Sequence, residues 1–225
     1  FSQSLTSQSY GAFDEGKLVT FLGLVPSVIR VGESRLNVYS LGSVCTHPDY
    51  RGKGYASAVL ERVLAHVDRA GAALLLVTGT RSLYTRANCH LFGDVTRFVL
   101  KPDEADAFIQ YRSAKEVHIR ELEGTDWLKL SELASARETR YEQSVWDLAT
   151  LVHAEPYASC IRLYHKVLVA EKDGELQGFL VFGVPYRLGL KWPPTAFEWA
   201  GDAEIVAVLL ATAVRRFNLE RLDVP

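Results

Sequence analysis

Alternating apolar and polar positions near the start of the chain predict a β-hairpin. Residues 8–13 and 17–25 have the short, apolar-rich pattern of strands, and the polar residues 14–16 between them are typical of a turn. Pro26 is expected to end the second strand, because proline cannot donate a hydrogen bond to a sheet. After a second turn, residues 38–46 predict a third strand.

A helix is predicted next, because apolar residues recur at intervals of three and four positions after Gly54. These residues are Val59, Leu60, Val63, Leu64 and Val67. The helix should run from Gly54 to about Arg69 and stop at Gly71, since glycine commonly follows the end of a helix. The apolar run at 73–77 then predicts a central strand that is covered on both faces.

A short helix and one more strand complete the first half. Ser82 is expected to cap a helix that carries Tyr84 and Arg86. Residues 95–100 predict the last strand of this half. The polar sequence Lys-Pro-Asp-Glu that follows breaks the pattern, so we place the domain junction between positions 101 and 116.

The second half begins with elements of its own and then echoes the first. A strand is predicted at 117–120, followed by a helix capped near Thr125 and another helix at 143–152. Residues 174–185 then match residues 16–26 in composition and spacing.

The echo continues with a helix at 206–217 and a strand at 219–224, in the order seen after the hairpin of the first half. Such self-similarity indicates a duplicated unit. The predicted domains are residues 1–112 and residues 113–225.

Composition and charge are those of an ordinary globular protein. Of the 225 residues, 48% are hydrophobic, and the formal net charge is −2 with acidic and basic residues interspersed. We therefore expect no nucleic-acid surface and no membrane surface. No apolar run approaches the roughly 18 residues of a membrane span, and we expect no secretory segment, which together predict a soluble, cytoplasmic protein.

Cysteine and histidine patterns predict neither disulfides nor a metal. The three cysteines, Cys45, Cys89 and Cys160, show no paired spacing, as is typical of a reducing compartment. The six histidines are scattered without ligand spacing, so no metal site is predicted.

The strongest chemical signal is the loop between the third strand and the long helix. It reads Arg51-Gly52-Lys53-Gly54. The two glycines let backbone N–H groups approach a ligand closely, and the helix start adds unpaired amides with a partial positive charge. Arg51 and Lys53 add two full charges, so the loop suits a pyrophosphate.

Two common nucleotide loops are excluded by spacing. A phosphate loop of the NTPase type needs Ser or Thr after its lysine, but Gly54 follows Lys53. A dinucleotide fingerprint needs a third glycine where Ser57 stands, and an acidic residue where the apolar run 73–77 lies.

The sequence Arg51-Gly52-Lys53-Gly54-Tyr55-Ala56 fits the pattern Q/R-x-x-G-x-G/A. In this motif, and in the order of elements over about residues 7–100, the chain resembles the GNAT N-acetyltransferases. The resemblance implies an α/β (α+β) fold with a mixed sheet, the acyl-CoA N-acyltransferase fold.

The resemblance also assigns roles to residues. The backbone of Val44, Cys45 and Thr46 is expected to bind the pantetheine arm of acetyl-CoA, and the amides from Gly52 to Ala56, which include Tyr55, its pyrophosphate. The segment Leu83-Tyr84-Thr85-Arg86 matches a family pattern whose tyrosine lies near the thioester sulfur. Tyr84 is therefore the candidate acid that protonates the departing thiolate.

A nucleophilic pair of Cys45 and His47 is the alternative reading of this strand. The two residues share a face of an extended strand. The resemblance instead makes this strand a backbone-binding one with no covalent role. No general base is assigned, because residues 37–46 carry no acid; a water chain, Asp14 and a residue of the second half all stay open.

The second half lacks the phosphate loop. Its corresponding helix is preceded by Ala200-Gly201-Asp202-Ala203-Glu204, with one glycine, no base and two carboxylates. Carboxylates stabilise a bare helix start but repel a pyrophosphate. We read two tandem GNAT-like domains, the second degenerate, structural and unable to bind CoA.

The predicted function is direct transfer of an acetyl group from acetyl-CoA to a primary amine, on a small molecule or a peptide. A homodimer is compatible with the sequence. The alternatives are a non-catalytic acyl-CoA-binding module and, more remotely, a site for another phosphate ligand. Retention of the Leu-Tyr segment favours the enzyme.

Overall fold

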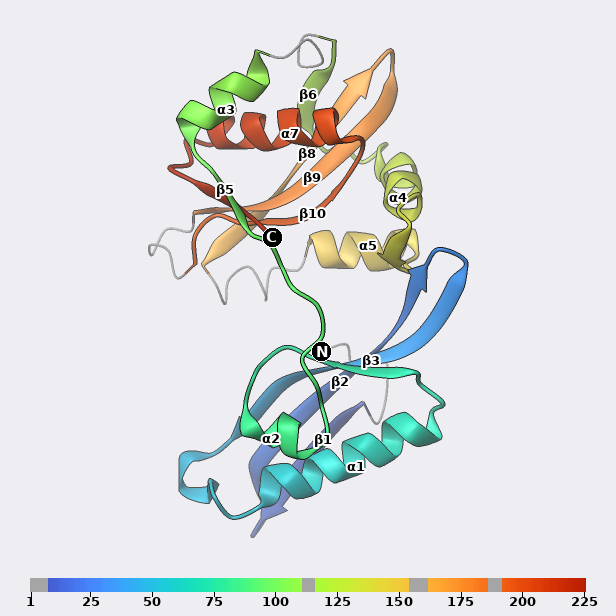
Figure 1. Ribbon diagram of the computed structural model, residues 1–225, viewed down its shortest axis with the longest axis vertical. Helices are drawn as coiled ribbons and strands as arrows, with labels where there is room; N and C mark the ends of the chain where they lie inside the picture. The colour runs from blue at the N-terminus through green and yellow to red at the C-terminus, as the bar shows by residue number, and fades with distance from the viewer. Residues whose placement is uncertain (1–7, 111–115, 154–161, 186–191) are drawn as a thin grey trace. The chain divides into compact units, whose positions relative to one another are not determined.

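The chain folds into two compact units, each with its own sheet and hydrophobic core. The computed structural model describes residues 8–110, 116–153, 162–185 and 192–225. Unit 1 comprises residues 1–93 and 138–142, and unit 2 comprises residues 94–137 and 143–225. Helices pack against a sheet in both units (Figure 1).

Unit 1 contains a five-stranded mixed sheet. Its strands are β1 (Ser9–Asp14), β2 (Lys17–Val31), β3 (Ser34–Thr46), β4 (Leu74–Val77) and β7 (Thr139–Tyr141). The order is β1-β2-β3-β4, with β7 also paired to β2. All pairings are antiparallel except that of β3 with β4.

The predicted hairpin is confirmed, but β2 does not end at Pro26. β1 pairs with β2 as far as Gly23, and Leu24 N–H donates to the carbonyl of Gln8. On the same edge, β7 takes over at Val28, whose carbonyl accepts from Glu142 N–H. Backbone groups of a strand alternate between its two edges, so the Pro26 nitrogen faces the same edge as Leu24 and Val28, in the gap between β1 and β7. Its missing N–H therefore removes no hydrogen bond between strands.

The long helix of unit 1 is confirmed. Helix α1 (Tyr55–Arg69) buries Val59, Leu60 and Val63 against the sheet, as the periodicity predicts. Gly71 follows it with a φ of +64°. The segment 73–77 is different from its prediction: β4 is an edge strand of the described sheet, and Leu74 is 46% exposed.

The predicted cap of the short helix is wrong. Helix α2 (Ser82–Arg86) begins one residue earlier than predicted, with Arg81 at the N-cap and no side-chain cap. The Ser82 hydroxyl instead accepts a hydrogen bond from Nη1 of Arg86, 3.0 Å away.

Unit 2 is built on a four-stranded antiparallel sheet of order β10-β9-β8-β6, with β11 and β5 forming a separate antiparallel pair. The strands are β5 (Phe98–Leu100), β6 (His118–Glu121), β8 (Leu163–Lys172), β9 (Glu175–Pro185), β10 (Ala196–Ala200) and β11 (Leu222–Val224). The helices are α3 (Pro102–Ile109), α4 (Trp127–Ser135), α5 (Val145–Val152) and α7 (Ala203–Arg216).

The compact units differ from the predicted domains, 1–112 and 113–225, in two places. Strand β5, predicted as the last strand of the first half, pairs with β11 and so lies in unit 2. Residues 138–142 lie in unit 1, because β7 extends the sheet along β2. Neither pairing can be read from local sequence.

The predicted junction also contains a helix. Pro102 occupies the first turn of α3, and the Glu104 carboxylate accepts from Lys101 N–H at 2.8 Å. The polar residues 101–104, predicted to interrupt the pattern, are therefore a helix start. Part of the predicted junction, residues 111–115, lies outside the described residues.

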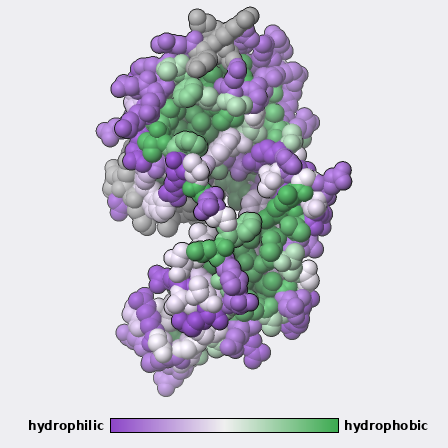
Figure 2. Space-filling view, viewed as in Figure 1, coloured by the Kyte–Doolittle hydropathy of each residue, from purple (hydrophilic) through white to green (hydrophobic). Residues whose placement is uncertain are grey.

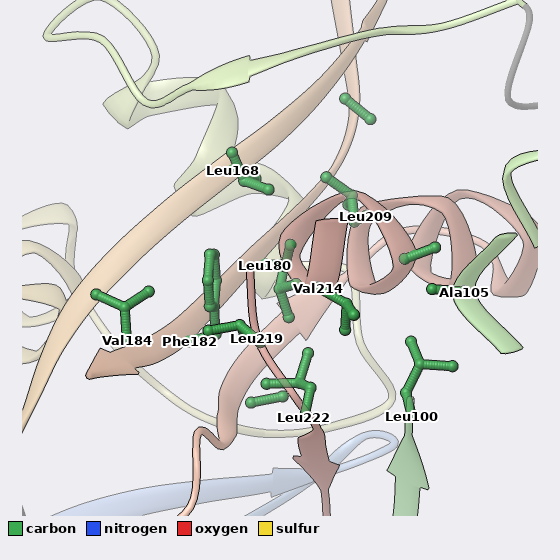
Figure 3. Close-up of a cluster of buried hydrophobic side chains, with 14 of the residues drawn as sticks. Leu100, Ala105, Leu168, Leu180, Phe182, Val184, Leu209, Val214, Leu219 and Leu222 are labelled. Carbon is green, nitrogen blue, oxygen red and sulfur yellow. The ribbon is translucent and has the colours of Figure 1, made fainter. Parts of the chain in front are cut away.

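Unit 2 has a large apolar core between α7 and its strands. Figure 3 shows Leu180, Phe182, Val214 and Leu222 gathered in it, from β9, α7 and β11. On the edge of the sheet, Arg120 on β6 forms a bidentate pair with Asp126, at 2.6 and 2.9 Å. This guanidinium lowers the pKa of the buried Asp126 carboxyl.

The order of elements repeats between the units. Unit 1 runs β1, β2, β3, α1, β4, and unit 2 runs β8, β9, β10, α7, β11. The first three strands of each series are paired in sequence order and antiparallel. The predicted elements of the echo, at 174–185, 206–217 and 219–224, correspond to β9, α7 and β11.

Large apolar side chains are exposed on both units. They include Phe13, Leu91 and Phe92 in unit 1, and Phe98 in unit 2. On the face shown in Figure 2, hydrophilic side chains are interrupted by apolar areas. In the part of the chain that the structure describes, these side chains are exposed to solvent.

Candidate functional site

The end of β3 has an open edge. β3 pairs with β4 only from Val38 to Leu41, so residues 42–46 continue past β4. His47 N–H donates to the Val19 carbonyl on the β2 side. Because strand backbone groups alternate in direction, those of Val44 and Thr46 face the opposite edge.

A tight loop connects this edge to α1. The 3-10 helix η1 (Pro48–Tyr50) leads into Gly52 and Gly54, whose φ angles are +77° and +85°. Such angles are costly for residues with a Cβ, so the loop needs glycine at both positions. Gly54 is the N-cap of α1 and supplies no side chain to its first amides, which are left free for an anion.

The loop, the end of β3 and α2 enclose a pocket of about 600 Å³. Eight of the ten residues predicted for the site line it: Val44, Cys45, Thr46, Arg51, Gly52, Gly54, Tyr55 and Ala56. Residues from the end of β3, the loop and the α2 region thus line one pocket.

Lys53 and Tyr84 are placed elsewhere. The Lys53 ammonium lies over the ring of Tyr50, 4.7 Å from its centroid, and Lys53 is not among the lining residues. Tyr84 is buried, 7% exposed, in the core cluster between α1 and the sheet. Its neighbours Ser82 and Leu83 line the pocket instead, so the catalytic role of Tyr84 stays a prediction.

Three arginines line the pocket, and the sequence analysis assigned a site role to only one of them. Arg51 donates from Nε to the Thr46 carbonyl at 3.2 Å, which ties the loop to the end of β3. Arg81, the N-cap of α2, and Arg86, its last residue, also line the pocket. Arg86 is part of the Leu-Tyr-x-Arg segment, so the sequence offered a signal that it belongs to the site. Arg81 lies outside any motif, so the sequence offered none.

The loop is also tied to the turn of the first hairpin. Tyr55, the first residue of α1, hydrogen-bonds to the carboxylate of Asp14. Burial raises the pKa of the Tyr55 phenol, and the negative charge of Asp14 raises it further. Tyr55 therefore stays neutral near pH 7 and adds no charge that would repel a phosphate.

The Cys45–His47 alternative gains no support from the geometry. His47 Nδ1 accepts from Asp49 N–H at 3.3 Å, so this ring nitrogen is turned to η1. Cys45 is an exposed free thiol and Cys89 a partly buried one, while Cys160 lies outside the described residues.

Comparison with known proteins identifies the part of the chain that holds this pocket. Residues 3–92 match the sequence model of the acetyltransferase (GNAT) domain. This segment is a GNAT acetyltransferase domain. The match covers strands β1 to β4, the glycine loop and α2, so the pocket described above lies within the matched segment. No curated protein matches the chain in sequence.

Solved structures share the fold. A GCN5-related N-acetyltransferase from Kribbella flavida is 18% identical, with a TM-score of 0.67 over 95% of this chain and 52% of that one. Another from Anabaena variabilis is 16% identical, with a TM-score of 0.70 over 96% of this chain and 55% of that one. This chain thus spans about half the length of these two proteins.

A third similar structure comes from yeast. N-myristoyltransferase of Saccharomyces cerevisiae, solved with bound myristoyl-CoA, is 14% identical, with a TM-score of 0.58 over 93% of this chain and 61% of that one. At such identities the likeness is one of fold: a mixed α/β fold with a mixed sheet.

In residues 8–110, 116–153, 162–185 and 192–225, no cluster of three His, Cys, Asp or Glu residues could hold a metal ion. None of the helices in this described part is long and apolar enough to cross a membrane.

The equivalent helix start in unit 2 is closed by its own chain. Asp202 caps α7, its carboxylate accepting from Ile205 N–H at 2.8 Å. A Cβ added to Gly201 would lie 2.9 Å from the Gln177 carbonyl oxygen and 3.0 Å from Gly178 Cα. The loop before α7 therefore packs backbone to backbone on β9, and the amides of this helix are already partly satisfied.

Proposed function

We propose that the chain is an N-acetyltransferase that moves an acetyl group from acetyl-CoA directly to a primary amine. The observation that carries the proposal is the pocket at the glycine loop of the GNAT domain, beside the end of β3 that extends past β4. Among the described residues that line it, none is a carboxylate. The loop suits the pyrophosphate, and the strand edge suits the amide groups of the pantetheine arm.

In this proposal the backbone at Val44 and Thr46 orients the donor. An N–H group on the open edge of β3 polarises the thioester carbonyl, and the amine nitrogen attacks its carbon. The new C–N bond forms as the C–S bond breaks. The thiolate takes a proton from the Tyr84 hydroxyl, and the proton lost by the amine leaves to solvent.

A second candidate, a non-catalytic acyl-CoA-binding module, is favoured by two observations. Tyr84 is buried in the core rather than lining the pocket. No carboxylate is present among the described residues that line the pocket, so these residues provide no acidic general base. Turnover distinguishes the two candidates.

The test is to incubate the protein with acetyl-CoA and a panel of primary amines, among them polyamines, aminoglycosides, amino acids and a peptide. Loss of thioester absorbance and the mass of an acetylated amine are measured. Enzymatic transfer predicts both, in proportion to protein concentration. Binding of acetyl-CoA with no acetylated product from any amine would favour the module.

Tyr84→Phe tests the acid. If the hydroxyl protonates the thiolate, we expect kcat to fall by about 10²- to 10⁴-fold, the usual contribution of general acid catalysis, with little change in acetyl-CoA affinity. Tyr141→Phe, at an exposed tyrosine of the same unit, is the matched control. An unchanged kcat in Tyr84→Phe would show that the assigned acid is wrong.

We further propose that unit 2 is a degenerate GNAT-like domain that does not bind CoA. The repeated order of elements supports the tandem arrangement. The capped and closed start of α7 supports the loss of the phosphate site.

A further inference from the structure

The described lining of the pocket is basic. It includes three guanidinium groups, those of Arg51, Arg81 and Arg86, and no carboxylate among the described residues. The chain as a whole has 25 basic and 27 acidic residues, so this lining is a local concentration of positive charge. A cleft lined by one sign of charge raises the local concentration of ligands of the opposite sign. Charge should therefore select the molecule that shares the pocket with the acyl donor.

Two carboxylates next to the pocket are not part of its described lining. Asp14 accepts a hydrogen bond from the Tyr55 hydroxyl. The Asp49 carboxylate lies 3.7 Å from Nδ1 of His47, and its side chain is 80% exposed. Neither residue is among those that line the pocket. In the part of the chain that the structure describes, the lining thus offers a cationic amine no carboxylate to pair with.

Two of the three arginines belong to the short helix α2. Arg81 is its N-cap and Arg86 its last residue, and both are exposed. Arg86 donates from Nη1 to the Ser82 hydroxyl at 3.0 Å, which holds its side chain along the helix. Within the described ranges neither arginine forms an ion pair with a carboxylate, so their charge is available to a ligand.

The loop and α2 have different places in the proposed reaction. The loop, with Arg51, takes the pyrophosphate, whereas α2 carries Tyr84, the proposed proton donor to the thiolate. The pantetheine arm that joins the pyrophosphate to the thioester is uncharged. At physiological ionic strength, exposed charges more than about 8 Å apart are largely screened from one another. The α2 arginines should therefore act on charges of the acceptor amine, since the donor is uncharged at this end.

We propose that Arg81 and Arg86 bind an acidic group of the acceptor, so that the amines which the chain acetylates also carry a carboxylate. A guanidinium pairs with a carboxylate through two parallel N–H···O bonds, which fixes its position as well as its charge. Amino acids and acidic peptides belong to this class. Polyamines and aminoglycosides do not, because each additional ammonium would meet guanidinium groups of like charge. The inference rests on the proposed acetyl transfer and names its acceptor class.

Calorimetric titration of the CoA-saturated protein with two peptide amides, Ala-Glu-amide and Ala-Gln-amide, tests the inference. The peptides share their α-amine and differ by one carboxylate. We expect the unmodified chain to bind Ala-Glu-amide at least about tenfold more tightly than Ala-Gln-amide. The double variant Arg81→Gln/Arg86→Gln should bind both with the affinity of Ala-Gln-amide. Arg62→Gln, at an exposed arginine of α1 outside the pocket, should keep the preference.

The affinity of the double variant for acetyl-CoA should stay unchanged, which also shows that the variant is folded. A fall in this affinity would overturn the inference, because the α2 arginines would then serve the donor. Equal binding of the two peptides by the unmodified chain, or no binding of either, would overturn it as well.

Turnover separates this inference from the proposed function. With acetyl-CoA as donor, we expect kcat/KM to be highest for Ala-Glu-amide, lower for Ala-Gln-amide and lowest for spermidine. Spermidine as the best acceptor would overturn the inference and leave acetyl transfer standing. Preferential binding of Ala-Glu-amide without an acetylated product from any amine would overturn the proposed function and leave the site for an acidic group standing.

Discussion

Cys45 is a natural chemical probe of the pocket. It lies on the part of β3 that extends past β4, it is exposed, and it lines the pocket. Cys89 is partly buried in the core cluster near Tyr84 and is not among the lining residues. The two thiols therefore report on the pocket and on the fold, respectively.

Acetyl-CoA should protect Cys45 from alkylation by iodoacetamide. At a ligand concentration of 100 times Kd, only about 1% of the pocket is free, so the rate at Cys45 should fall by up to about 100-fold. The rate at Cys89 in the same sample should not change. Mass spectrometry of the two cysteine peptides measures both rates, and equal rates at Cys45 with and without ligand would place the ligand elsewhere.

The helices and strands of the GNAT domain can be predicted from the sequence where the signal lies within the element itself. The hairpin, α1 and the glycine loop are set by periodicity and by residues that need a positive φ, such as Gly52 and Gly54. Strand β7 could not be predicted, because its three residues have no apolar pattern and its stability comes from β2, distant in sequence. Tertiary pairing decides such elements.

The candidate site could also be predicted only in part. The glycine loop was predicted as a phosphate site because its motif is contained in six consecutive residues, 51–56. Arg81 was not, because its place on the pocket depends on where α2 packs after β4. Tyr84 was assigned by motif, and its burial could not be seen in the sequence, since a tyrosine is compatible with both a core and a pocket.

Strand β7 is held to unit 1 by charge as well as by its backbone. Glu142, directly after β7, accepts from Arg30 Nε at 2.7 Å and from Arg35 Nη2 at 3.0 Å. These two arginines, Arg35 foremost, lower the pKa of Glu142 to about 2, from an ordinary value of 4.5. Since the folded-state pKa is lowered, the stabilisation is full above pH 4.5 and is lost as the pH falls from 4.5 towards 2.

Glu142→Gln should therefore loosen β7. Near neutral pH we expect faster hydrogen exchange at residues 139–141 in the variant than in the unmodified chain, with a small effect because the pair is partly exposed. The difference between the two proteins should shrink below pH 4.5. Glu61→Gln, at an exposed carboxylate of α1, is the control. A difference that persists unchanged at pH 2.5 would show that the charge of Glu142 does not hold the strand.

The series of three strands, a helix and a strand occurs in both units, and in unit 1 the loop before the helix suits a phosphate. In unit 1 the glycines leave the start of α1 open, with arginines around it. In unit 2 the capping by Asp202 and the backbone contact at Gly201 close the start of α7. We therefore expect one acyl-CoA site per chain, at the loop of the GNAT domain.

Calorimetric titration with acetyl-CoA tests this expectation. We expect one site per chain, and binding that is about 10- to 100-fold weaker in Arg51→Gln, since each lost charge-assisted hydrogen bond costs about 1.5–3 kcal/mol. Arg62→Gln should bind as the unmodified chain does. Two sites per chain, no binding, or full affinity in Arg51→Gln would show that the glycine loop is not the one acyl-CoA site.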